Sequence, residues 1–217
     1  MNKPISSLLA ASALVLLTAT CKQKPAAAPA QVPQAPPQPT LPAPPPPRPA
    51  CESMDERCQA LPETELEVPE SRARFRPPAS WTYARETSAA VTVAPDGNAV
   101  LAFALAANPE ADAMGTTLEQ LFTRLQISGV QAAALKARFK KPDSVIPTEG
   151  GTLQLWELEK AAPRPLMNGK AGSLLVVHAV FGDQTLVGAG FVVKPAAEAQ
   201  AAPIMTSVQS LRSPGPQ

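Results

Sequence analysis

Few side chains in this sequence have the type and spacing needed for catalysis. His178 is the single histidine of the chain. It falls in an apolar stretch and shares a face of the expected strand with Leu174 and Val176, which is typical of a core histidine with one hydrogen-bond partner rather than of a general base. Glu157 and Glu159 would lie about 7 Å apart on one face of a strand, near the separation of paired glycosidase acids. Solvent-facing glutamates show the same spacing, so an exported hydrolase of unrecognised type is the alternative function.

Motifs that hold cofactors or activate nucleophiles are absent from the sequence. It contains no Gly-x-Ser-x-Gly, no His-Glu-x-x-His and no Gly-rich phosphate-binding loop. Gly188 and Gly190 fall inside an expected strand, where glycine relieves packing against a covering helix. Trp81 and Trp156 are expected in the core, with a ligand-facing surface as the alternative. The sequence therefore predicts a protein that is not an enzyme, with no catalytic residue, no cofactor and no metal site.

Residues 1–20 have the features of an export signal. Lys3 supplies one positive charge, residues 5–19 are mostly apolar, and small residues precede Cys21. The apolar run is diluted by serine and threonine and is shorter than the ~20 residues that span a bilayer. We therefore expect a cleaved signal peptide rather than a membrane-spanning helix. A cut elsewhere, near residues 26–28, is the alternative and would discard Cys21.

The end of this segment, Leu-Leu-Thr-Ala-Thr-Cys at residues 16–21, resembles the lipobox of bacterial lipoproteins. It departs from the usual pattern at Thr18, where leucine is common, and at Thr20, where Gly, Ala or Ser is common. The resemblance implies that Cys21 becomes the acylated first residue of the mature protein and anchors it to a membrane. Lys22 is not the Asp that favours inner-membrane retention in lipoprotein sorting, so the outer membrane is favoured, with the domain in the periplasm.

Residues 21–50 combine this cysteine with a Pro/Ala-rich linker. Twelve of the 27 prolines lie between Pro25 and Pro49, and large apolar residues are almost absent there. Such a composition cannot build a core, so the segment is expected to be disordered in the manner of a semi-rigid spacer, at ~3 Å per residue and about 80 Å when fully extended. A docking motif for a proline-reading groove at residues 44–48 is the alternative.

Charge argues against a nucleic-acid partner. The chain carries 19 basic and 18 acidic side chains, and removal of residues 1–20 would take away only Lys3. A neutral mature protein cannot hold a polyanion by neutralising its phosphates, and it has no net positive charge to assist membrane binding. Its expected partners are the membrane, through the acyl chains on Cys21, and another envelope protein.

An acidic collar is expected at residues 51–74. In an exported protein, Cys51 and Cys58 are expected to form a local disulfide, whereas their spacing does not favour a metal pair or a redox pair. Seven acids in residues 51–70 accompany one arginine. We expect a solvated strip whose carboxylates pair with the arginines that follow, namely Arg72, Arg74 and Arg76.

Hydrophobic periodicity predicts an α+β domain at residues 75–212, followed by a short tail at 213–217. The expected strands are 81–84, 89–94, 99–107, 152–160, 173–181 and 185–193, with hairpins at Asp96-Gly97 and at residues 182–184. The expected helices are 117–125, opened by a capping box at Thr117–Gln120, then 130–139 and 196–212. Residues 142–151 are expected to interrupt the regular structure, with neither helix nor strand. Together they predict an antiparallel sheet of about six strands covered by helices.

The order of these elements resembles the PsbP-like α/β/α sandwich, whose bacterial members include small envelope lipoproteins of the DcrB type. The anchor positions are an opening Phe-x-x-Pro-x-x-Trp, a Thr-Leu-x-x-Leu helix start and a final strand with Gly-Ala-Gly-Phe, at Phe75, Pro78, Trp81, Thr117, Leu118, Leu121 and residues 188–191. The resemblance implies a binding or assembly-accessory role with no shared catalytic residues. The predicted function is therefore a non-catalytic envelope lipoprotein that binds an envelope protein or component.

Overall fold

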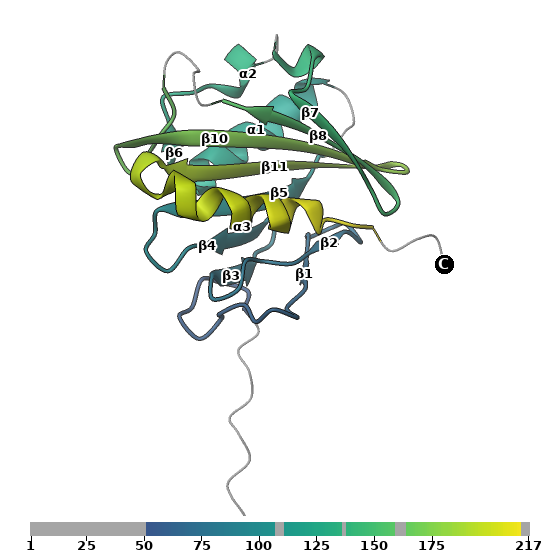
Figure 1. Ribbon diagram of the computed structural model, residues 1–217. Helices are drawn as coiled ribbons and strands as arrows, with labels where there is room; N and C mark the ends of the chain where they lie inside the picture. The colour runs from purple at the N-terminus through teal and green to yellow at the C-terminus, as the bar shows by residue number, and fades with distance from the viewer. Residues whose placement is uncertain (1–50, 107–110, 136–137, 159–163, 214–217) are drawn as a thin grey trace, which may run out of the picture. The chain divides into compact units, whose positions relative to one another are not determined.

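A computed structural model of the protein describes residues 51–106, 111–135, 138–158 and 164–213. The expected signal, Cys21, the tether, Glu159 and the tail beyond Ser213 lie outside these residues. The described part is an α+β structure in which helices pack on an antiparallel sheet, as the sequence predicts. Figure 1 shows helix α3 across the front of this sheet and α1 behind it.

The main sheet has nine strands, and every pairing between its described strands is antiparallel. Seven strands follow the spatial order β3-β4-β5-β11-β10-β8-β7, while β6 and β9 pair at one end of β10. The bounds are β3 (Thr82–Arg85), β4 (Ala90–Val93), β5 (Ala99–Leu105), β6 (Ile127–Ser128), β7 (Ser144–Thr148), β8 (Gly151–Glu157), β9 (Leu166–Met167), β10 (Lys170–Phe181) and β11 (Gln184–Val193).

A small second sheet and three α-helices complete the described part. The second sheet pairs β1 (Leu66–Glu67) with β2 (Arg74–Phe75). The helices are α1 (Ala111–Arg124), α2 (Ala132–Leu135) and α3 (Ala197–Gln209), with single 3₁₀ turns at Arg138–Lys140 and Lys194–Ala196. Residues 51–74 belong to the same compact unit as the rest, since Val68 and Ala73 are fully buried.

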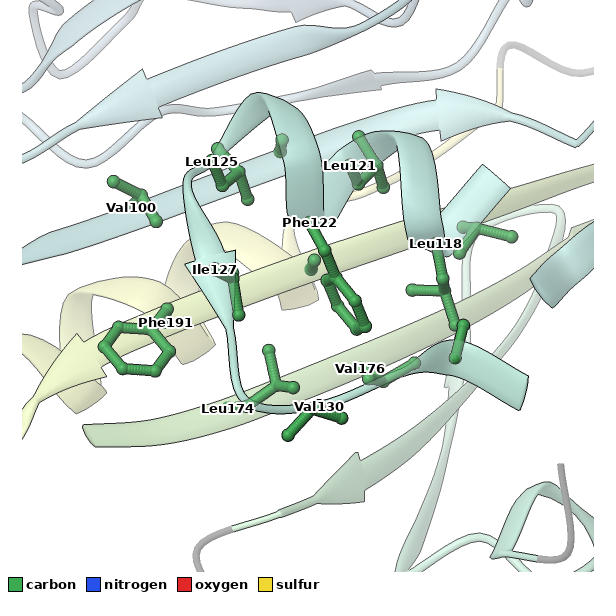
Figure 2. Close-up of a cluster of buried hydrophobic side chains, with 14 of the residues drawn as sticks. Val100, Leu118, Leu121, Phe122, Leu125, Ile127, Val130, Leu174, Val176 and Phe191 are labelled. Carbon is green, nitrogen blue, oxygen red and sulfur yellow. The ribbon is translucent and has the colours of Figure 1, made fainter. Parts of the chain in front are cut away.

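The first of two cores lies between the sheet and α1. On the helix, Leu118, Leu121, Phe122 and Leu125 form the i, i+3, i+4, i+7 stripe that the sequence predicts, and all four are buried. They pack on alternate residues of the central strands, as Figure 2 shows for Val100, Leu174, Val176 and Phe191. Period-two alternation along the strands therefore supplies one apolar face to α1.

The second core lies on the opposite face of the sheet. Here the other set of alternate strand residues packs against α3 and against the small β1–β2 sheet. Ile204 and Val208 enter this core from α3, and Phe75 enters it from β2. The ring of Phe75 meets that of Phe103 edge-on, with centroids 4.8 Å apart. The central strands are thus covered on both faces, which is why they read as continuous apolar runs.

The two glycines of β11 have different roles on this second face. At Gly190 the covering helix α3 is the neighbour, as expected, but a Cβ would make only an ordinary contact, at 3.4 Å, with Ile204, so no tight packing is relieved there. At Gly188 the expectation is wrong. A Cβ there would lie 2.5 Å from the ring of Phe103, so this glycine leaves room for an aromatic side chain of the neighbouring strand β5.

Several boundaries differ from the sequence prediction. The capping box at Thr117–Gln120 is wrong, because α1 already begins at Ala111 and Thr117 therefore lies inside the helix. The expected break at residues 142–151 contains strand β7, which forms a hairpin with β8. The expected helix at 130–139 is present only as the short α2 and a 3₁₀ turn, with residues 136–137 outside the description.

The N-terminal end of the described chain runs along the edge strand β3. The backbone N–H of Arg85 donates to Cys51 at 2.8 Å and that of Tyr83 donates to Cys58 at 2.9 Å, while Ala60 donates to Trp81 at 2.8 Å. These bonds occupy donors and acceptors that an edge strand would otherwise offer to another chain. Residues 51–60 therefore close one edge of the sheet, at the point where the tether sequence ends.

The room left for Phe103 predicts opposite effects for two Gly→Ala substitutions. Gly188→Ala should lower the free energy of unfolding by about 1–3 kcal/mol, because the new methyl group clashes with the ring. Gly115→Ala should raise it by up to about 1 kcal/mol, because Gly115 lies inside α1 with nothing within 4 Å of the new Cβ. Urea denaturation of both variants measures the two changes, and equal effects would contradict this packing.

Candidate functional site

The described residues contain neither a cluster of potential metal ligands nor a helix that could cross a membrane. Within these ranges no three or more His, Cys, Asp or Glu side chains gather closely enough to hold a metal ion. No helix among them combines the length and the apolar character needed to cross a membrane. The candidate sites in the described residues are single titratable groups and grooves.

His178 lies on the α1 face of β10, on the side that the sequence predicts. It is only partly buried, yet its Nδ1 atom is enclosed and has no hydrogen-bond partner among the described residues. The one hydrogen-bond partner that the sequence predicts is therefore not at Nδ1. Its ring lies 6.5 Å from that of Trp156, and its cross-strand neighbours are Gln154 and Val187. Burial lowers its pKa because no acid compensates for the desolvation of the imidazolium.

The two tryptophans are core residues, as the sequence predicts. Trp81 packs in the α3-side core and Trp156 in the α1-side core, and both are almost fully buried. The indole N–H of Trp156 donates to the carbonyls of Arg138 and Lys141, at 3.1 and 3.0 Å. Neither ring is free to contact a ligand. Glu157 is exposed at the end of β8.

A groove of about 360 Å³ lies where the collar, the small sheet and β3 meet. We call it the arginine groove, and its lining residues are Cys51, Glu65, Leu66, Glu67, Arg74, Tyr83 and Arg85. The alternation of β1 and β2 explains its polarity. Leu66 and Phe75 are directly paired and point into the core, so the residues on either side of them point outward.

Each glutamate of the groove is shared by two arginines. Arg74 donates to one carboxylate oxygen of Glu67 at 3.3 Å, and Arg85 donates to the other at 3.2 Å. Glu65 likewise forms ion pairs with Arg76, at 3.7 Å, and with Arg212. Four guanidinium groups thus surround two carboxylates, and the cluster keeps an excess of two positive charges.

These pairs partly match the sequence prediction for the acidic collar. Arg74 and Arg76 pair with collar acids as expected. Arg72 was also expected to pair with a collar acid, but its backbone N–H donates a long hydrogen bond, of 3.5 Å, to the side-chain oxygen of Gln184. Arg85 and Arg212 also pair with collar acids, from distant parts of the chain, and no sequence pattern indicated them.

The disulfide lies at one wall of the arginine groove. Cys51 and Cys58 are joined, with a Cα–Cα distance of 5.7 Å, and the backbone at both cysteines is bonded to β3. Within the bridged loop, Arg57 donates hydrogen bonds to the carboxylate of Asp55 and thereby lowers the pKa of Asp55 to about 2. The bridged loop is thus fixed to the sheet by backbone bonds and by a local ion pair.

A second, mainly apolar groove of about 190 Å³ lies between α3 and the strands β10 and β11. Its lining includes Leu175, Gly190, Ala201 and Met205, with Glu157 at its rim. Ala201, predicted on the apolar face of α3, is exposed here. The groove exists partly because Gly190 has no side chain to fill it.

No family model matches the chain, and no curated protein matches it either.

The buried, unpaired Nδ1 of His178 predicts a specific pH dependence. Since its pKa is lowered in the folded state, the unfolded chain binds more protons once the pH falls toward the ordinary value of about 6.5. The titration of His178 should therefore leave the free energy of unfolding unchanged at neutral pH. It should lower this free energy as the pH falls from about 6.5 toward the folded pKa. The variant His178→Gln should lack this part of the decrease in urea denaturation.

Because the chain has one histidine, a single imidazole signal in proton NMR reports its titration directly. We expect a midpoint below 6.5 in the folded protein. A midpoint above 6.5 would contradict the structural environment described for His178.

Proposed function

We propose that this chain is a non-catalytic bacterial cell-envelope lipoprotein whose α+β domain binds an envelope protein or component. The observation that carries the proposal is the order of the N-terminal features. An export-type signal ends at Cys21 within a lipobox-like sequence, and a proline-rich spacer then leads to the domain. Such an order is typical of a domain held near a membrane at some distance from it.

Two structural features support this proposal. Cys51 and Cys58 are bridged, and disulfides persist mainly in exported proteins. The domain also offers an open, charged groove at the end where the tether sequence joins it. A non-catalytic binding role requires an accessible surface of this kind and no catalytic residue.

The finer fold belongs to the same proposal. A sheet with α1 on one face and α3 on the other is consistent with the PsbP-like sandwich that the sequence resembles. Within that fold we propose an assembly or accessory role, with the anchor in the outer membrane and the domain in the periplasm.

The intact mass of the protein, purified from bacterial membranes, tests the anchor. We expect a mature chain that begins at Cys21 and carries two or three acyl chains, because the lipobox-like sequence directs both acylation and cleavage. We also expect a gain of two daltons on reduction, from the one disulfide. The matched variant Cys21→Ala should lose the acyl mass and keep the gain on reduction. A wild-type product without lipid, or one that begins beyond Cys21, would overturn the proposal.

A further inference from the structure

We propose that the arginine groove binds the phosphate group of an envelope molecule. The groove lies beside the disulfide and is lined by Arg74, Arg85 and Tyr83, with Glu67 between the two arginines. Guanidinium groups and a phenol are donors, and two arginines aimed at one place form a common arrangement for oxyanions.

Charge is the first argument. Glu67 has one negative charge and faces two guanidinium groups. Its neighbour Glu65 also faces two, those of Arg76 and Arg212. The carboxylates therefore neutralise half of the positive charge. A phosphate monoester carries about −1.5 to −2 at neutral pH, which is close to the excess of two positive charges in the cluster.

Hydrogen-bond capacity is the second argument. Each guanidinium has five N–H donors, and Glu67 accepts from one nitrogen of each arginine at 3.2–3.3 Å. The side chains of Arg74 and Arg85 are about half exposed, at 50% and 48%. They can therefore donate to an incoming anion while Glu67 still holds them in place.

Rigidity is the third argument. Arg74 lies on β2 and exchanges backbone hydrogen bonds with Arg212, while Arg85 lies on β3 and donates its backbone N–H to the carbonyl of Cys51. Under Arg74, the buried pair Leu66 and Phe75 fixes the small sheet to the core. Donors on strands of this kind need little reordering when a ligand binds.

Phosphate fits this groove better than a carboxylate does. A phosphate monoester carries about −1.5 to −2 at neutral pH whereas a carboxylate carries a single negative charge, and the phenol ring of Tyr83 offers an apolar wall for the group that carries the phosphate. The phosphate can belong to a lipid headgroup or to a soluble phosphoester. The lipid source rests on the proposed envelope location, whereas the phosphate chemistry does not.

The test is a calorimetric titration of the full-length protein in a neutral detergent. The ligands are inorganic phosphate, glycerol 3-phosphate and short-chain phosphatidic acid, whose headgroup is also a phosphate monoester, each at low ionic strength. We expect saturable binding of inorganic phosphate that weakens with added salt. Stronger binding of the lipid would identify a headgroup as the natural source, and stronger binding of glycerol 3-phosphate would identify a soluble phosphoester.

Three variants make the assignment specific. Arg74→Gln with Arg85→Gln should weaken phosphate binding at least tenfold. The control Arg138→Gln removes an arginine that is as exposed as Arg74 and Arg85 but lies away from the groove. It should change phosphate binding less than twofold. Glu67→Gln should strengthen binding at least threefold, because it removes the competing carboxylate and keeps an acceptor for both arginines.

The Glu67→Gln result separates a binding role from a purely structural one, since a scaffold of ion pairs would only be weakened by the change. Thermal melting of each variant shows whether it is folded. Absence of saturable binding by all three ligands would overturn the proposal, as would weaker binding in Glu67→Gln. Neither result would affect the mass measurement on Cys21, so the failure of one proposal can be told from the failure of the other.

Discussion

Burial of the central strands on both faces is the constraint on which the rest of this structure depends. Strands β5, β10 and β11 are apolar on both sides, so each face of the sheet must be covered. One face is covered by α1. The other is covered by α3 together with the small β1–β2 sheet, which comes from residues before the first strand of the main sheet. The acidic collar is therefore held to the domain by Leu66 and Phe75 beneath it, and its outward charges become a surface with a fixed shape.

The edge of the sheet at β3 is covered by the N-terminal end of the described chain. Residues 51–60 run beside this strand and use its free backbone groups, and the disulfide closes the loop that does so. The same arrangement brings Arg85 of β3 next to Glu67 and Arg74 of the small sheet. Edge protection and assembly of the arginine groove thus depend on the same contacts. Cys51, the first described residue after the proline-rich sequence, lines this groove.

The fold class followed from local patterns, because a two-faced apolar strand and an i, i+4 stripe are visible in the sequence. The α1 stripe and the hairpins at residues 95–98 and 182–183 are present as predicted. The Asn168-Gly169 turn was missed, although Asn-Gly is a strong hairpin signal, because its first strand β9 has only two residues. The groove could be predicted only in part. Alternation places Glu65 and Glu67 opposite Arg76 and Arg74, but the approach of Arg85 and Arg212 depends on tertiary packing.

We infer that the groove side of the domain meets an envelope component while the opposite edge does not. Photo-crosslinking in intact cells tests it most directly, with p-benzoylphenylalanine placed at Tyr83 in the groove or at Val145, which is 56% exposed on the far edge strand β7. We expect an adduct at position 83 that is lost when Arg74 and Arg85 are both changed to glutamine, and none at position 145. Equal adducts at both positions, or an adduct at position 145 alone, would contradict it.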